Sequence, residues 1–358
     1  MSSKVYLDKD TVKPSRNSSI ELLRMLAIFM VLLVHANYYS LGAPSIQDVK
    51  INSIDSFWRI FFEAASIVSV NVFILISGWF GIKPTFKGLF NFLFQCIFFF
   101  TGLYLISVLS GFEELSVKGL AGCILVGKHN WFIMSYLLLY ILSPVLNKFI
   151  NNTNRKEFRL VLIAYFLFIC SYGWMRVANF VCDGYSTIFF IGLYLLARYM
   201  RLYSPKLTKY SCKTYFFIYT SITLCVTATI FLVYYIFGKG LPLNLFAYCS
   251  PTTIIGALCL ILAFTKIELK SKIINWCGIS TFAVFLMHFS PSTLHHYKSL
   301  FINLHNEVSV FHFWIYTFLI LIAIFSISII IDKLRIYLYN ICWNKFFSII
   351  INKFFHCS

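Results

Sequence analysis

Charged residues are scarce in this chain of 358 residues, and their scarcity limits what kind of protein it can be. Asp, Glu, Lys and Arg together make up 12% of the sequence, whereas hydrophobic residues make up 59% and aromatic residues 19%. An ordinary soluble domain carries about a quarter charged residues. The composition therefore excludes a soluble domain and indicates a protein with many membrane-spanning segments.

Acidic residues are the rarer of the two charged kinds. The chain has 13 acidic and 30 basic residues, which gives a formal net charge of +17. In a membrane protein this excess serves mainly as an insertion signal, and it also suits anionic lipid headgroups and anionic cytoplasmic ligands. We expect membrane lipids as partners and no interaction with nucleic acid.

Paired cysteines and a cleavable signal peptide are also missing. The 11 cysteines are spread singly, with none at the spacing of metal ligands or of a redox pair. We therefore predict no metal site and no permanently bound cofactor. The chain begins with a polar stretch, and no small-residue cleavage site follows the first apolar run, so the first helix is expected to remain in the mature protein.

Long apolar runs follow one another along the chain. A spanning helix needs about 20 mostly apolar residues, and a window of that length finds about ten candidates. The predicted spans are residues 20–40, 60–82, 88–110, 131–150, 158–174, 185–203, 212–237, 244–265, 274–291 and 312–334. For the second span, any start from Phe57 to Ile67 is compatible with the sequence. A further run at 117–126 is too short to cross and is expected at the interface. The predicted fold class is all-α, a polytopic transmembrane bundle of about ten helices.

The distribution of lysine and arginine predicts the orientation, because short cytoplasmic loops carry the excess of these residues. With the N-terminus in the cytoplasm, the outer segments hold only Lys50, Arg59, Lys118, Lys128, Arg176, Lys239 and Lys298. Both termini are therefore expected in the cytoplasm. The corresponding division is a cytoplasmic tail at 1–15, a membrane domain at 16–336 and an amphipathic cytoplasmic tail at 337–358.

The first predicted span contains an arginine, Arg24, and a histidine, His35. Their separation in sequence returns a helix to within about 20° of its starting direction, with a rise of about 16 Å. The two side chains therefore face the same way at different depths. An ionisable residue at membrane depth is costly and marks a functional site by default. Each residue also has a structural explanation. Arg24 would extend its side chain to the inner interface, and His35 would contact headgroups or a backbone carbonyl.

Further polar and aromatic candidates stand in other spans. Ser77 precedes a glycine in the second span, where close helix packing is the alternative explanation. Asn130 and Trp131 stand at the start of the fourth span, and Trp131 is alternatively an ordinary interfacial residue. His288 lies near the outer end of the ninth span, at a depth similar to that of His35. The two histidines are candidates for one shared site.

Five segments, in order, resemble motifs of the acyltransferase-3 family of integral membrane acyltransferases. They are residues 20–35, similar to the family's opening motif; 71–78, similar to its "FFxxSG" element; 130–132 with Tyr140 and Pro144, similar to its "WF" helix; 190–194, similar to its "GYY" helix; and 278–288, similar to its "GxxSxxxYLxH" segment. The resemblance covers roughly residues 16 to 335 and identifies the predicted membrane domain as an acyltransferase domain.

The resemblance implies transfer of an acyl group, most often acetyl from cytoplasmic acetyl-CoA, to a hydroxyl of an envelope polysaccharide or lipid-linked saccharide. Arg24 and His35 correspond to the family's required pair. A positive inner mouth with Arg24, Lys83 and Lys87 would hold the donor phosphates. His35 would deprotonate the acceptor hydroxyl or carry the acyl group transiently.

The remaining candidates for binding substrate are Ser77, Asn130, Trp131 and His288, of which His288 would orient the acceptor or the thioester carbonyl. The family and the absence of organelle signals indicate the bacterial cytoplasmic membrane.

The chain departs from the family in two respects. Only Lys83 and Lys87 stand where many members carry arginine-rich segments, and no hydrolase-like domain is expected after the last span. The alternative function is a transporter or flippase for a glycan or small solute, in which Arg24 and His35 form an anion site and a proton relay. No internal repeat in the sequence supports that alternative.

Overall fold

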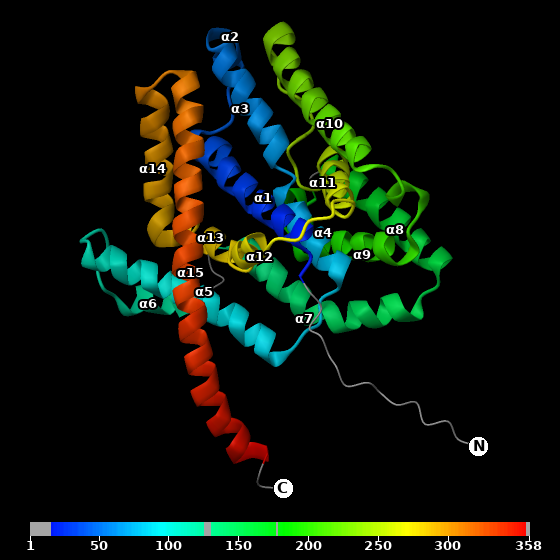
Figure 1. The fold of residues 1–358 in the computed structure, drawn as a ribbon. Helices are drawn as coiled ribbons and strands as arrows, with labels where there is room; N and C mark the ends of the chain where they lie inside the picture. Colours follow the sequence, from blue (N-terminus) through cyan, green and yellow to red (C-terminus); the bar gives the residue numbers. More distant parts are fainter. Residues whose placement is uncertain (1–15, 125–129, 177, 356–358) are drawn as a thin grey trace.

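The chain folds into a bundle of helices, shown as a ribbon in Figure 1. A computed structural model describes residues 16–124, 130–176 and 178–355, and these contain no strand. The helices are α1 Ser18–Val34, α2 Ile46–Ile51, α3 Ser53–Ser66, α4 Ser69–Phe80, α5 Phe86–Leu109, α6 Val117–Ile124, α7 Trp131–Asn152, α8 Arg155–Phe168, α9 Thr187–Tyr203, α10 Cys212–Leu232, α11 Pro251–Phe264, α12 Lys272–Gly278, α13 Thr281–His288, α14 Pro291–Glu307 and α15 Val310–Phe355.

Membrane-spanning length is reached by most of the predicted segments. In the part of the chain that the structure describes, seven helical segments are long and apolar enough to cross a membrane, and a bent pair makes up to eight. This confirms the all-α, multi-pass fold. The predicted spans 185–203 and 244–265 contain shorter helices. These are α9, with 17 residues, and α11, with 14.

The two shorter helices lie in the core of the bundle. α9 and α11 both pack against α4. Phe189, Phe190 and Tyr194 of α9 are 0% exposed, as are Ala257 and Ile261 of α11. Their apolar character therefore fits burial against other helices.

The N-terminal helix α1 is enclosed by α3, α4, α12 and α13. Its N-cap is Asn17, whose side chain accepts from the backbone N–H groups of Ser19 and Ile20. Ser18 Oγ accepts from the backbone N–H of Ser271, at 3.0 Å, at the start of α12. Ser19 Oγ donates to the carbonyl of Ile267. The start of α1 is therefore anchored to a segment distant in sequence.

The second span begins earlier than predicted and contains buried charges. It runs from α3 through α4 and covers Ser53–Phe80. Arg59, predicted to lie in an outer loop, is inside α3 and 5% exposed. The prediction was wrong because a hydropathy window treats a charged residue as a loop even where neighbouring helices supply its partners.

The ninth span bends instead of ending in a loop. The segment Lys272–His288 meets α14 at an angle of 82°. Pro291 stands at the first turn of α14, where it needs no hydrogen-bonding N–H. The bend places the end of α13 beside α14.

Other predicted boundaries have mixed outcomes. Within the run at 117–126, the described residues 117–124 form α6, which has only 8 residues. Helix α15 continues without a break past residue 336, where the sequence predicts a tail, and Figure 1 shows it as the long orange-to-red helix. The predicted N-terminal tail at 1–15 and Lys128 lie outside the described residues.

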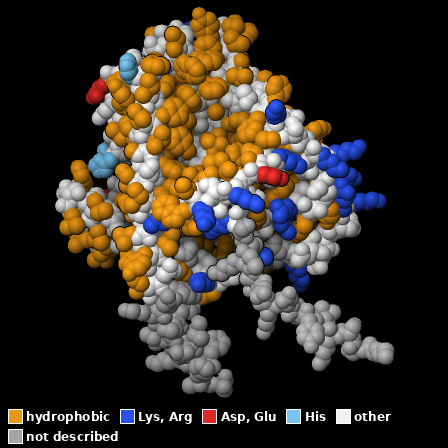
Figure 2. Space-filling view, viewed as in Figure 1, with side chains coloured by type: hydrophobic (Ala, Val, Ile, Leu, Met, Phe, Trp, Pro, Cys, Tyr) orange, Lys and Arg blue, Asp and Glu red, His pale blue; other side chains and the backbone are white. Residues whose placement is uncertain are grey.

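The surface separates hydrophobic from basic side chains. Figure 2 shows hydrophobic side chains over the upper part of one face, and Lys and Arg side chains toward its lower and right-hand parts. This arrangement is what a lipid-embedded bundle with one basic end requires. The cytoplasmic location of both termini stays a prediction.

Replacing Gly78 with alanine is expected to destabilise the protein. A Cβ at Gly78 would lie 2.5 Å from the carbonyl oxygen of Tyr194 and 2.8 Å from Cβ of Ala197, both in α9. Moving α4 away from α9 should cost about 1–3 kcal/mol. The measurement is the midpoint of thermal unfolding of the purified protein in detergent. Gly102→Ala is the matched control, because a Cβ there meets nothing within 4 Å; equal midpoints for both variants would contradict the prediction.

Candidate active site

A cavity of about 1090 Å³ runs beside α1. Arg24 and His35 both line it, as the helical spacing predicts for two side chains on one face. Its walls also include residues of α4, α5, α7 and α13 and of the segment 241–248. One continuous space therefore connects the two ends of α1 that carry ionisable side chains.

His35 stands where the helical geometry changes. It is the first residue of a π-helical turn, η1 (His35–Tyr39), which continues α1. Ser40 Oγ donates to the carbonyl oxygen of His35 at 2.6 Å, and the imidazole stacks on Phe289 with ring centroids 4.5 Å apart. Single π-helical turns occur frequently at functional sites.

His288 lies directly behind His35. His35 Nδ1 is 2.8 Å from His288 Nε2, and His288 Nδ1 is 2.7 Å from the carbonyl oxygen of Val284. His288 is 3% exposed, whereas His35 borders the cavity. The structure thus joins the two histidines that the sequence placed at a similar depth.

The hydrogen bonds of this pair determine which nitrogens carry protons. The carbonyl of Val284 can only accept, so Nδ1 of His288 carries the hydrogen. In the neutral pair, Nε2 of His288 then accepts from Nδ1–H of His35. The remaining nitrogen, Nε2 of His35, keeps its lone pair. This tautomer makes His35 a proton acceptor at the cavity wall.

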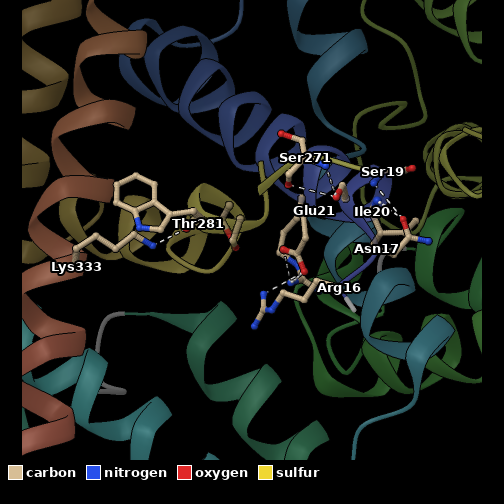
Figure 3. A network of polar contacts seen from close by, with 12 residues as sticks. Arg16, Asn17, Ser19, Ile20, Glu21, Ser271, Thr281 and Lys333 are labelled. Atoms are coloured by element: carbon tan, nitrogen blue, oxygen red, sulfur yellow. Dashed lines mark hydrogen bonds and ion pairs between the residues drawn. The ribbon is translucent and has the colours of Figure 1, made fainter. Parts of the chain in front are cut away.

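The other end of the cavity carries positive charge. Arg24 Nη1 lies 3.1 Å and 3.0 Å from the two carboxylate oxygens of Glu21, and Arg16 Nη1 lies 3.2 Å from Glu21 Oε1. Figure 3 shows Arg16 and Glu21 beside the start of α1. Two guanidinium groups share one carboxylate, so the group keeps a net positive charge. Both arginines line the cavity.

Comparison with known families defines the class of this site. A family model described as an acyltransferase domain matches residues 17–333, nearly the whole chain. The chain belongs to the acyltransferase-3 family. No curated protein and no solved structure matches it. The match agrees with the resemblance expected for residues 16 to 335, and the multi-pass fold makes the protein a membrane acyltransferase.

The substrate-binding candidates of this acyltransferase are only partly brought to the cavity. Ser77 and Trp131 line it. Ser77 Oγ donates to the carbonyl oxygen of Phe73 at 3.0 Å and lies 3.4 Å from the Tyr136 hydroxyl. Asn130 is instead the N-cap of α7, where its side chain accepts from the backbone N–H of Ile133. Its position beside Trp131 therefore has a structural explanation.

The predicted donor contacts Lys83 and Lys87 lie elsewhere. Both are exposed near the start of α5, and neither lines the cavity. Arg16, which the sequence analysis did not single out, lies in the wall instead. Arg16 directly precedes Asn17, the N-cap of the helix that carries Arg24. This position in the sequence could have identified Arg16 as a candidate.

Glu63 is a second residue that sequence reasoning missed. It lies in α3, is 3% exposed, and borders the cavity. Asn37 Nδ2 donates to its Oε2 at 3.1 Å. Asn37 is in the same π-helical turn as His35, so the carboxylate belongs to the histidine end of the cavity. A glutamate within an otherwise apolar span is the signal that could have singled it out.

A buried ion pair supports the wall formed by α5. Asp332 Oδ1 lies 2.8 Å from Arg335 Nη2, and the residues are 0% and 3% exposed. Arg335 Nη1 donates to Asn91 Oδ1 at 3.0 Å, and Gln95 Nε2 donates to Asp332 Oδ1 at 3.2 Å. Because both amide side chains line the cavity, the pair behind them fixes the polar part of this wall.

Breaking this pair from one side is expected to destabilise the acyltransferase. Asp332→Ala leaves Arg335 as a buried charge whose strongest partner is missing, which should cost about 3–5 kcal/mol. The measurement is thermal unfolding in detergent.

The double variant Asp332→Leu with Arg335→Met is the matched comparison, because it removes both charges. It is expected to recover most of the lost stability. A double variant as unstable as Asp332→Ala would show that packing, not the unpaired charge, causes the loss.

Proposed function

We propose that the protein transfers an acetyl group from acetyl-CoA to a hydroxyl of an envelope polysaccharide or lipid-linked saccharide. The observation that carries the proposal is the cavity beside α1, with two arginines at one end and His35, backed by His288, at the other. Membership in the acyltransferase-3 family supports the reaction class.

The positive end suits the donor. Acetyl-CoA carries several phosphates, and guanidinium groups bind phosphate with charge-assisted, often bidentate hydrogen bonds. Arg16 and Arg24 present such groups to the cavity. With the phosphates held there, the extended pantetheine arm directs the thioester along α1 toward His35, over a rise of about 16 Å.

The histidine end suits the chemical step. Nε2 of His35 takes the proton of the acceptor hydroxyl while the hydroxyl oxygen attacks the thioester carbonyl carbon. The C–S bond breaks, and the departing thiolate takes the proton back from His35, so the imidazole is regenerated. His288 accepts the hydrogen bond from Nδ1–H throughout and acts as a positioning residue. A transient acyl-histidine at the same Nε2 is the alternative mechanism.

The proposed location is the bacterial cytoplasmic membrane, with the arginine end of the cavity toward the cytoplasm. Acetyl-CoA is made inside the cell, whereas the acceptor belongs to the envelope. A cavity with ends of different chemistry suits substrates that arrive from opposite sides.

Removing the base tests the mechanism. In membrane vesicles given labelled acetyl-CoA on the cytoplasmic side, His35→Ala at matched expression should lose about 10²- to 10⁴-fold of the transfer to a glycan fraction. Label in the glycan with the variant as well would refute this role. Absence of label with the wild type, together with proton-coupled solute flux, would instead favour a transporter.

Variants of His288 separate positioning from packing. His288→Leu leaves the Nδ1–H of His35 unpaired and should lower kcat about 10- to 100-fold. His288→Gln is the matched variant, because its amide oxygen can accept the same hydrogen bond and should restore part of kcat. Equal kcat values for the two variants would show that His288 only fills space.

Arg24→Ala tests the donor end. Loss of one guanidinium–phosphate interaction should raise the KM for acetyl-CoA about ten-fold or more and change kcat less. Lys83→Ala is the comparison, since Lys83 is exposed outside the cavity. A larger rise in KM for Lys83→Ala than for Arg24→Ala would place the phosphates outside the cavity.

A further inference from the structure

Three aromatic side chains form one wall of the cavity. The rings of Trp131 and Tyr185 have centroids 4.5 Å apart, those of Tyr185 and Tyr248 are 4.8 Å apart, and those of Trp131 and Tyr248 are 5.7 Å apart. All three residues line the cavity. We call Trp131, Tyr185 and Tyr248 the aromatic wall.

The aromatic wall is held from behind by fixed contacts. Asn71, which is 0% exposed, donates from Nδ2 to the carbonyl oxygen of Tyr248 at 2.8 Å. Gly184 has a positive φ of 96°, and a Cβ there would lie 2.6 Å from Cβ of Tyr248. A glycine at this position lets the loops carrying Tyr185 and Tyr248 meet. The wall is therefore a built surface.

The Glu63 carboxyl group lines the same cavity as the aromatic wall. Asn37 donates to Glu63 Oε2 and accepts from Arg59 Nε at 3.4 Å. Glu63 is thus held in place by a side chain two positions from His35.

The charges around Glu63 indicate what it can bind. Arg59 Nη1 lies 3.7 Å from Asp55 Oδ2, and His305 Nε2 lies 3.1 Å from the same oxygen. The group contains two carboxyl groups and one guanidinium, and Arg59 is already paired with Asp55. A carboxyl group at the wall offers oxygen atoms to ligands that donate hydrogen bonds, and it provides no positive charge for a phosphate. The donor is anionic, so this end is suited to the other substrate.

From this arrangement we propose that Glu63 and the aromatic wall form the acceptor subsite and take one uncharged pyranose ring. The inference rests on the proposed acetyl transfer to a saccharide. The apolar C–H face of the ring lies on the aromatic wall, and neighbouring hydroxyls hydrogen-bond to the Glu63 carboxyl group. Ligand sites commonly combine such an apolar wall with a few placed polar groups. The hydroxyl to be acetylated then points to Nε2 of His35.

The experiment measures acceptor kinetics with the full-length protein in detergent. Acetyl-CoA is held at saturation, and the methyl glycosides of glucose, galactose and N-acetylglucosamine are the acceptors, with acetylated product quantified by mass spectrometry. Glu63→Gln keeps the size and an oxygen for Asn37 but replaces the other carboxyl oxygen with an amide nitrogen that cannot accept a hydrogen bond. It should raise the acceptor KM at least about ten-fold, with the KM for acetyl-CoA unchanged.

Asp55→Asn is the matched control, because Asp55 belongs to the same charged group but does not line the cavity. Its acceptor KM should stay within about two-fold of the wild type. Trp131→Leu is the second test variant and should raise the acceptor KM through loss of the stacking surface.

Three results would overturn the proposal. One is a Glu63→Gln variant with unchanged acceptor KM, and another is a loss of kcat alone, which would make Glu63 a proton carrier. The third is transfer to an envelope glycan extract by the wild type but to none of the glycosides. Failure of the proposed function is distinguishable from all three, since the wild type would then transfer no acetyl to any acceptor.

Discussion

The pairing of α1 with the segment that ends in α13 organises this protein. Ser18 and Ser19 bond to Ser271 and Ile267 at one end, and His35 contacts His288 at the other. Polar groups embedded in lipid must find their partners within the protein. Because these partners all come from one distant stretch of chain, the pairing of the two segments positions both ends of the cavity.

The same pairing sets the state of the functional groups. A Cβ on Gly278 would lie 2.8 Å from Cβ of Glu21, so the lack of a side chain there lets Glu21 lie against α12. Glu21 in turn holds Arg24 and Arg16. At the other end, the carbonyl of Val284 sets the tautomer of His288 and, through it, that of His35. Residues that touch no substrate thus determine how both ends act.

Sequence patterns predicted the elements whose signal is local. Apolar runs located the helices, and helical spacing placed Arg24 and His35 on one face, because both signals depend only on nearby residues. Arg59 was misplaced because Asn37 and the carbonyl of Gly42 become its partners only when α3 packs beside η1. Lys83 and Lys87 were assigned to the donor from their end of the membrane, which gives no direction relative to a cavity. Whether a residue is buried, and whether its side chain points into a cavity, depends on tertiary contacts that local sequence patterns do not contain.

Under the proposed mechanism, the rigidity of α1 divides the work of recognition between the two ends. A helix fixes the rise between Arg24 and His35 at about 16 Å. A donor fits only if its thioester lies at the matching distance from its phosphates, and in coenzyme A thioesters this distance is set by the pantetheine arm, whatever acyl group they carry. The arginine end therefore selects the coenzyme. Selection of the acceptor is left to the walls around His35. At this end the cavity is lined by Glu63, which accepts hydrogen bonds, and by apolar aromatic surface, whereas the other end is lined by arginines.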